Sequence, residues 1–271
     1  MDAQMPVALE GQTMMGLSCA SLSCDGFGDE NFVPSLDLLP DIGYEYIELN
    51  CWNPADLTPT TTTNLRRRCD EADLTPVAVY GASFGGTGFD RSKDVSHKIR
   101  MIDAAVELGC HRVVATGAPR GEQGGLDGVI DVLNEVVPYA EKQGVLVCLE
   151  NHANNNIETI EDYETILSAV DSNNVGVCVD TGHFEAAGIE LEDVVDRLHC
   201  DIVHIHVKET SVFGEEDFIR FGEGDTDNER FLELMLDHGY YGYVTVELAL
   251  KDKSNVRRDL REPIEMFDQY F

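Results

Sequence analysis

The sequence is poor in positive charge. Only 19 of its 271 residues are Lys or Arg, and 6 of these are Lys, against 51 Asp and Glu, which gives a formal net charge of −32. Because nucleic acids and anionic membrane surfaces are polyanions, this charge argues against nonspecific binding to either. The acidic residues are spread along the whole chain, and we interpret them as adaptation to high salt, which screens their mutual repulsion.

The sequence also lacks any uninterrupted apolar run of about 18 residues, and its N-terminus has no basic segment followed by an apolar one. Neither membrane insertion nor export is therefore indicated. The eight cysteines form no CxxC pair, and Cys148 and Cys178 lie inside apolar runs, where a thiol behaves as a small hydrophobic group. We therefore expect reduced thiols and a cytoplasmic protein.

A regular repeat is present instead. Short apolar, β-branched runs recur at intervals of 27 to 41 residues, the length of a strand, a helix and two loops; they begin near residues 15, 46, 76, 112, 145, 175, 202 and 243. Segments between them show the helical spacing of apolar residues or helix end signals, namely 61–72, 94–108, 128–142, 159–170, 192–198 and 228–238.

Eight strands alternating with helices predict an α/β fold, a (β/α)8 TIM barrel, with a doubly wound open sheet as the alternative. No low-complexity linker divides the chain. We therefore expect a single barrel domain over residues 15–271, preceded by a flexible leader at residues 1–14.

Four of the apolar runs end in a residue that can bind a metal ion: Glu150, Asp180, His206 and Glu247. The C-terminal strand ends of a barrel converge on one face, so these side chains are expected in one pocket. Three carboxylates would repel one another there unless a cation neutralises them. Three oxygen donors and one imidazole nitrogen suit one divalent ion, with Mn²⁺ or Mg²⁺ favoured and Co²⁺ or Zn²⁺ also compatible.

Further residues near the strand ends are candidates for substrate contact: Glu48, Trp52, His152, His183 and Lys208. Each has a plainer interpretation. Trp52 can simply pack, and Lys208 can form a buried ion pair with Glu209 or Glu247. His204 shares a strand face with His206 one layer away, so we interpret it as a core or supporting histidine. A lone Asp at a strand end, such as Asp180, is commonly the cap of the next helix.

Five short motifs follow one another in the second half of the chain: LENH at 149–152, DTGH at 180–183, HIHVKE at 204–209, GEGDTD at 222–227 and GYVTVE at 242–247. With them the chain resembles the sugar phosphate isomerase/epimerase family of xylose-isomerase-like TIM barrels, in the superfamily of AP endonuclease family 2. The resemblance implies that Glu150, Asp180, His206 and Glu247 bind one divalent metal ion and that His183 contacts the substrate. The first four units agree only in pattern.

The chain departs from the ketose 3-epimerases of this family at two positions. Asn156 stands where they carry a substrate-contacting Glu, and Val212 stands where they carry an Arg. Lys208 resembles the Lys in the HxHxKD pattern of other members, the inosose dehydratase type among them, although Glu209 replaces the Asp. These differences count against a ketose 3-epimerase.

We therefore expect an enzyme, a divalent-metal-dependent isomerase or epimerase of a sugar or sugar phosphate. Glu150 and Glu247 would transfer a proton next to a carbonyl group at the metal. The alternative is an inosose-dehydratase-like lyase. Less favoured are a non-catalytic sugar-binding barrel and an apurinic endonuclease, which needs more histidines and a polyanionic substrate. The expected partner is a small carbohydrate, with no nucleic acid and no membrane; a homo-oligomer stays open.

Overall fold

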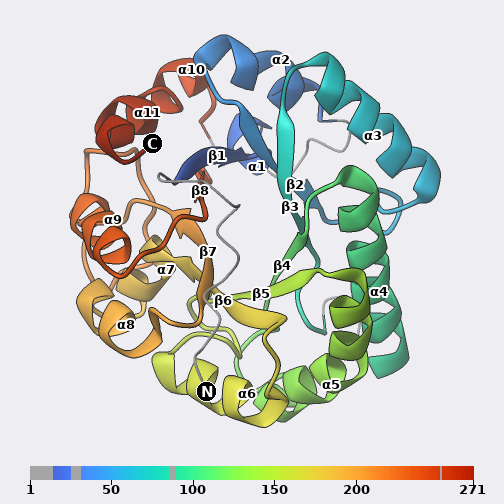
Figure 1. The fold of residues 1–271 in the computed structure, drawn as a ribbon. Coiled ribbons are helices and arrows are strands. Elements are labelled where there is room, and N and C mark those ends of the chain that lie inside the picture. The colour runs from blue at the N-terminus through green and yellow to red at the C-terminus, as the bar shows by residue number, and fades with distance from the viewer. Residues whose placement is uncertain (1–14, 26–31, 86–89, 251) are drawn as a thin grey trace.

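Eight parallel strands form a closed barrel with helices around it in the computed structural model of the chain (Figure 1). The structure describes residues 15–25, 32–85, 90–250 and 252–271. The closed sheet confirms the predicted (β/α)8 barrel and rules out the open doubly wound sheet. The predicted leader, residues 1–14, lies outside the described residues.

Each strand pairs with the next one in the chain, and β1 pairs with β8 to close the barrel. Every strand begins within one residue of its predicted start. The bounds are β1 Gly16–Ala20, β2 Tyr46–Cys51, β3 Thr75–Gly81, β4 Arg112–Thr116, β5 Leu146–Glu150, β6 Val175–Asp180, β7 Ile202–Val207 and β8 Tyr243–Val246.

All six predicted helices are present, with ends shifted by up to three residues. They are α3 Pro59–Glu71, α4 Arg91–Leu108, α5 Gly125–Gln143, α6 Ile160–Val170, α8 Leu191–Leu198 and α9 Asn228–Asp237. Five further helices were not predicted: α1 Leu22–Asp25, α2 Val33–Ile42, α7 Thr181–Ala186, α10 Val256–Asp259 and α11 Glu262–Phe267, followed by a 3₁₀ turn, Asp268–Tyr270. Two prolines obscured α2, although one of them occupies its first turn, where proline is tolerated.

Side chains alternate along each strand between the outer core and the barrel interior. Outward residues such as Ile47, Val177 and Ile205 are fully buried against the helices. Each such buried side chain contributes roughly 1.5–3 kcal/mol, so the outer ring holds the strands in register. Inward residues Cys148 and Cys178 precede polar ones by two positions, which places the polar side chains at the C-terminal mouth of the barrel.

All eight cysteines are free, and all but Cys200 are buried, as the prediction of reduced thiols requires. Among the described residues, no helix combines the length and the apolarity that a bilayer crossing needs.

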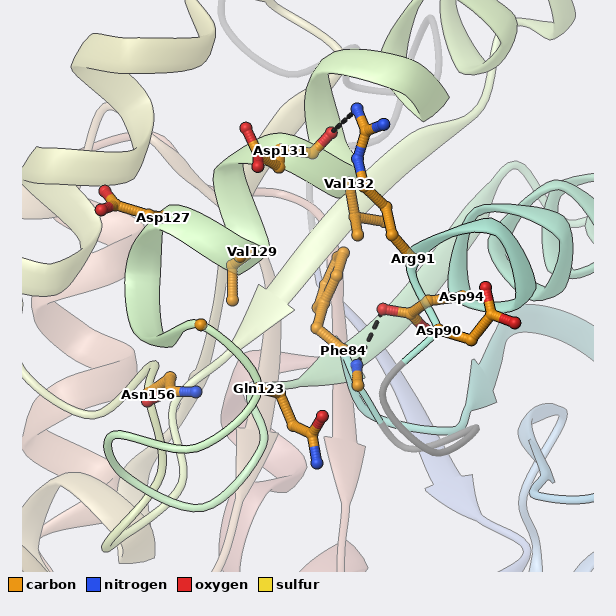
Figure 2. A pocket seen from close by; sticks show the side chains of 13 residues that line it. Phe84, Asp90, Arg91, Asp94, Gln123, Asp127, Val129, Asp131, Val132 and Asn156 are labelled. Carbon is orange, nitrogen blue, oxygen red and sulfur yellow. Dashed lines mark hydrogen bonds between the residues drawn. The ribbon is translucent and has the colours of Figure 1, made fainter.

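A cavity of about 180 Å³ lies between the N-terminal ends of α4 and α5 (Figure 2). Asn156 lines it, and its carboxamide is engaged at both ends: Oδ1 accepts from the Gly121 amide at 2.7 Å, and Nδ2 donates to the Glu122 carbonyl at 2.9 Å. The residue that stands in place of the epimerase Glu therefore fixes the loop between β4 and α5.

Candidate metal centre and active site

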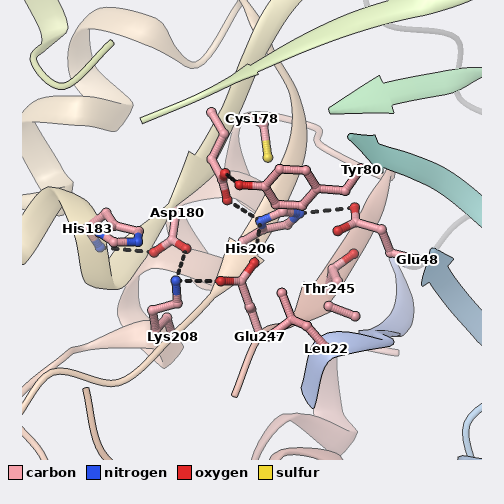
Figure 3. A network of polar contacts seen from close by, with 12 residues as sticks. Leu22, Glu48, Tyr80, Cys178, Asp180, His183, His206, Lys208, Thr245 and Glu247 are labelled. Atoms are coloured by element: carbon pink, nitrogen blue, oxygen red, sulfur yellow. Dashed lines mark hydrogen bonds and ion pairs between the residues drawn. The ribbon is translucent and has the colours of Figure 1, made fainter. Parts of the chain in front are cut away.

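The structure brings the four predicted metal ligands together at the mouth of the barrel (Figure 3). Glu150 and Asp180 are the last residues of β5 and β6, His206 is the penultimate residue of β7, and Glu247 directly follows β8. One potential ligand atom from each lies within 4.8 Å of the others, and all four residues are buried. Residues that are almost 100 positions apart in sequence therefore form one polar cluster.

His206 lies at the centre of this cluster. Its Nδ1 atom is 2.5 Å from Oε1 of Glu150 and 3.3 Å from Oε2 of Glu247, whereas its Nε2 atom is 3.1 Å from Oε2 of Glu48. Burial disfavours the charged imidazole, but Cys178, Glu48 and Glu150 outweigh burial and raise the pKa of His206 well above its usual value.

Lys208 lies between two of the candidate ligands. Its Nζ atom is 2.8 Å from Oδ2 of Asp180 and 2.6 Å from Oε1 of Glu247. Burial alone would lower the pKa of Lys208, but these two carboxylates raise it above its usual value, so the side chain carries a positive charge. The sequence suggested two ion-pair partners for Lys208. Glu247 forms this ion pair, and Glu209 does not.

The three carboxylates differ in their electrostatic surroundings. Burial raises the pKa of Glu150 and of Asp180. Burial acts on Glu247 in the same direction, but the nearby charges of Lys208 and His206 outweigh it and lower the pKa of Glu247. Glu247 is therefore the carboxylate that most firmly keeps its negative charge.

The donor set fits a divalent cation. Two enclosed carboxylate oxygens have charged partners: Oδ2 of Asp180 lies 2.8 Å from Nζ of Lys208, and Oε2 of Glu247 lies 3.3 Å from Nδ1 of His206. Three buried carboxylates this close together repel one another unless cations neutralise them, so the cluster indicates a cation site. Three oxygen donors and one nitrogen donor are compatible with Mn²⁺, Mg²⁺, Co²⁺ or Zn²⁺.

Asp180 caps a helix and also lies in the cluster of potential ligands. Its Oδ1 atom accepts a hydrogen bond from the His183 amide at 2.9 Å and so caps α7, while Oδ2 faces Lys208. The helix that this cap begins starts at Thr181. Asn151 also holds Asp180, with its side-chain amide bonded to the backbone N and O of Asp180 at 2.8 and 2.9 Å.

Two predicted substrate residues, His152 and His183, stack with ring centroids 3.8 Å apart. The Ala153 amide donates to Nδ1 of His183 at 3.4 Å. Burial lowers the pKa of His183 well below its usual value, so the ring is neutral and carries its proton on Nε2 as a hydrogen-bond donor. With exposed Glu216 the two histidines form a second group of potential ligands, but the donor role of Nε2 suits a substrate oxygen better than a metal ion.

Glu48, predicted to contact substrate, lies inside the barrel against two histidines. Its Oε2 atom is 2.9 Å from Nε2 of His204 and 3.1 Å from Nε2 of His206, and the residue is fully buried. Burial raises the pKa of Glu48, but the two histidines lower it to about 2. Burial lowers the pKa of His204 to about 4. Glu48 is therefore a carboxylate that accepts from both rings.

Sequence reasoning missed one residue of the cluster, Tyr80. Its hydroxyl donates to Oε2 of Glu150, and its ring packs against Trp52 with centroids 4.8 Å apart. Tyr80 occupies the last inward position of β3, as Glu150 does on β5. The strand-end position that identified the metal ligands could therefore have identified Tyr80 as well.

The loop between β7 and α9 covers the other side of the cluster. Phe218 lies edge-on to His183 with centroids 4.7 Å apart, and Nζ of Lys208 is 4.8 Å from the centre of its ring. Glu209 anchors this loop, because its carboxylate accepts from the Gly222 and Thr226 amides, both at 3.3 Å. Burial raises the pKa of Glu209 to about 7.

Gly224 in this loop has no room for a side chain. A Cβ atom there would lie 2.0 Å from the Thr210 carbonyl oxygen and 2.8 Å from Oε1 of Glu209. We expect Gly224→Ala to lower the free energy of unfolding by about 1–3 kcal/mol, measured by urea denaturation, because the backbone must move. The matched control, Glu223→Ala at the exposed neighbouring position, should change it by less than about 0.5 kcal/mol. Equal values for both variants would contradict this tight packing.

Curated relatives resemble the chain over most of its length. An inosose isomerase of Halalkalibacterium halodurans is 26% identical over 235 residues, which cover 81% of this chain and 83% of the relative. An inosose isomerase of Bacillus licheniformis is 24% identical over 264 residues, which cover 90% of this chain and 95% of the relative.

Solved structures share the fold. The crystal structure of the IolI protein with a bound zinc atom superposes with a TM-score of 0.78 at 23% identity, over 95% of this chain and 99% of that one. A D-tagatose 3-epimerase-like protein superposes with a TM-score of 0.74 at 23% identity, over 94% and 99%. The family model described as xylose isomerase-like TIM barrel matches residues 36–270. The chain therefore belongs to the xylose isomerase-like TIM barrel family.

Proposed function

We propose that the chain is a divalent-metal-dependent sugar isomerase or epimerase. The observation that carries this proposal is the cluster of Glu150, Asp180, His206 and Glu247, four buried residues whose potential ligand atoms lie within 4.8 Å of one another. These four residues would hold a divalent ion, which would act as a Lewis acid on a substrate carbonyl and make the neighbouring C–H group more acidic. The names of the relatives, inosose isomerase and D-tagatose 3-epimerase-like protein, support the same class of reaction.

Glu150 and Glu247 are the proposed acid and base. They extend from β5 and β8 and approach Nδ1 of His206 from different parts of the barrel. One carboxylate removes the proton next to the carbonyl, and the other returns it. Return to the opposite face of the same carbon is epimerisation, and return to the neighbouring carbon is isomerisation. The Tyr80 hydroxyl holds Oε2 of Glu150 and so orients its other oxygen toward the cluster.

His183 is the proposed donor to a substrate oxygen, through the N–H group at Nε2. Phe218 and Trp52 provide apolar walls on the two sides of the site and limit the entry of water. The charge of Lys208 stabilises negative charge that develops on the carbonyl oxygen when the proton leaves.

The proposed substrate is an uncharged sugar or cyclic polyol ketone. Lys208 is already balanced by Asp180 and Glu247. Arg120, in the loop after β4 on the same face, is balanced by Asp162 at 2.9 Å and Glu158 at 3.2 Å. A protein with a net charge of −32 also repels a phosphate group at low ionic strength.

Solvent deuterium exchange tests the proposed function. Purified protein with added Mn²⁺, Co²⁺ or Zn²⁺ is incubated in D₂O with inososes, free ketoses and phosphorylated ketoses, and NMR follows loss of carbon-bound protons. We expect deuterium at the carbon next to the carbonyl of at least one uncharged compound, because proton return draws on exchanged carboxylates. The matched control is the same protein with excess chelator.

Each outcome of this experiment is informative. Exchange only in phosphorylated compounds would contradict the uncharged substrate. Elimination of water would identify a lyase. No exchange in any compound would contradict the proposed function.

A further inference from the structure

A chain of buried polar groups lies inside the barrel beneath the four candidate metal ligands. Ser18, Glu48, His204 and Thr245 come from four different strands and are all fully buried. Polar groups in such a place cost free energy unless they are hydrogen-bonded, and apolar residues could have filled the space. These four residues are therefore expected to have a functional role, and their hydrogen bonds indicate what that role is.

These hydrogen bonds converge on one carboxylate oxygen, Oε2 of Glu48, which connects the group to His206. Oγ of Ser18 is 2.5 Å from Oγ1 of Thr245, which is 3.2 Å from Nε2 of His204. That nitrogen is 2.9 Å from Oε2 of Glu48, and the same oxygen is 3.1 Å from Nε2 of His206. One carboxylate oxygen thus accepts from both histidines, and Oε1 of Glu48 has no hydrogen bond.

We propose that Glu48 is a positioning residue that selects Nδ1 of His206 as the metal-binding nitrogen. A metal ion binds imidazole in its neutral form, which has one protonated nitrogen, and the partner of each nitrogen decides which one it is. Because Glu48 accepts at Nε2, the proton there is retained when an ion binds, and Nδ1, which faces Glu150 and Glu247, is the nitrogen whose lone pair becomes free for the ion. A carboxylate behind a metal-binding histidine also fixes the ring orientation and makes the ligand nitrogen more basic.

His204 completes this arrangement by holding Glu48 from the other side. The ring of His204 lies 5.2 Å from the ring of His206, edge to face. The two rings therefore contact Oε2 of Glu48 from different directions. Thr245 in turn holds His204. Glu48 is fully buried beneath His206, and both histidines occupy its Oε2 atom, so it acts on His206 and not on substrate.

This inference rests on the proposed function, because it requires that the four residues bind a metal ion. The first test compares Zn²⁺ affinity, by competition with a chromophoric chelator, among the wild type, Glu48→Gln and Asp94→Asn. Asp94 is the matched control, a buried carboxylate whose partner, Lys98, lies on α4 outside the barrel. We expect the dissociation constant of Glu48→Gln to rise about 10- to 100-fold and that of Asp94→Asn to stay unchanged.

The second measurement uses the wild type alone and does not depend on the folding of a variant. Imidazole ¹⁵N–¹H spectra of the Zn²⁺-loaded protein identify the nitrogen of His206 that keeps its proton. We expect a slowly exchanging, downfield N–H signal at Nε2, which in Glu48→Gln should move upfield and exchange faster.

The outcomes separate the two proposals. A wild type that binds no divalent ion would contradict the proposed function. A wild type that binds Zn²⁺ through Nε2 of His206, or a folded Glu48→Gln variant with wild-type affinity, would overturn the role of Glu48 and leave the proposed function intact.

Discussion

Replacement of Glu247 by Gln is expected to lower kcat/KM by about 10³-fold or more and to leave the barrel folded. Loss of a general acid or base alone costs about 10²–10⁴-fold, and this substitution also removes one negative charge from the metal ligands. Glu150→Gln should have a similar effect for the same reasons. Initial rates on the compound that exchanges deuterium measure the effect, and circular dichroism checks the fold.

Glu185→Gln is the matched control for these two variants. Glu185 is a buried carboxylate on α7, bonded to the Thr210 hydroxyl at 3.1 Å, and does not belong to the four-residue cluster. It should retain nearly all activity. If Glu150→Gln or Glu247→Gln kept more than about a tenth of the wild-type rate, that residue would be excluded as acid or base, given the size of such effects.

Removal of divalent ions should abolish the activity, and added Mn²⁺ or Co²⁺ should restore it. The four donors supply the charge that stabilises the ion, and without it no Lewis acid acts on the carbonyl. The melting temperature should also fall, because a ligand at 100 times its dissociation constant stabilises a fold by about 2.7 kcal/mol. Elemental analysis measures the bound metal before and after chelation. Activity assays and calorimetry on the same samples measure the change in rate and in melting temperature.

The metal-free protein should nevertheless remain folded. Lys208 and His206 lie among the three carboxylates and offset their repulsion. Full activity after exhaustive chelation would contradict the metal requirement. Three tightly held zinc ions per chain, in place of about one, would favour the nuclease alternative.

The sequence predicted the barrel and its mouth for a simple physical reason. A parallel strand buried on both faces is an apolar run, so a polar residue at its end stands out. Glu150 and Asp180 were identified in this way, and the structure places them together. Helix α2 was not predicted because Pro40 lies within it and interrupts the apolar pattern that indicates a helix.

Depth and pairing across strands could not be predicted. Glu48 is the third residue of β2, and its position alone did not show that it faces His204 and His206, more than 150 residues away in sequence. The contact between Lys208 and Asp180 likewise depends on the register of β7 against β6. Such contacts follow from the tilt and stagger of the whole barrel, which no local pattern encodes.

The pairing of β1 with β8 also has a consequence for the order of folding. Ser18 and Thr245 lie 227 residues apart in sequence, yet their hydroxyl groups meet across this seam, and Glu247 directly follows the strand that seals it. Contacts of such long sequence separation carry the largest loop-closure cost and slow folding. The four-residue cluster is complete only when the last strand has docked. The rate at which refolding protein binds an ion would therefore report the rate of the final step of barrel assembly.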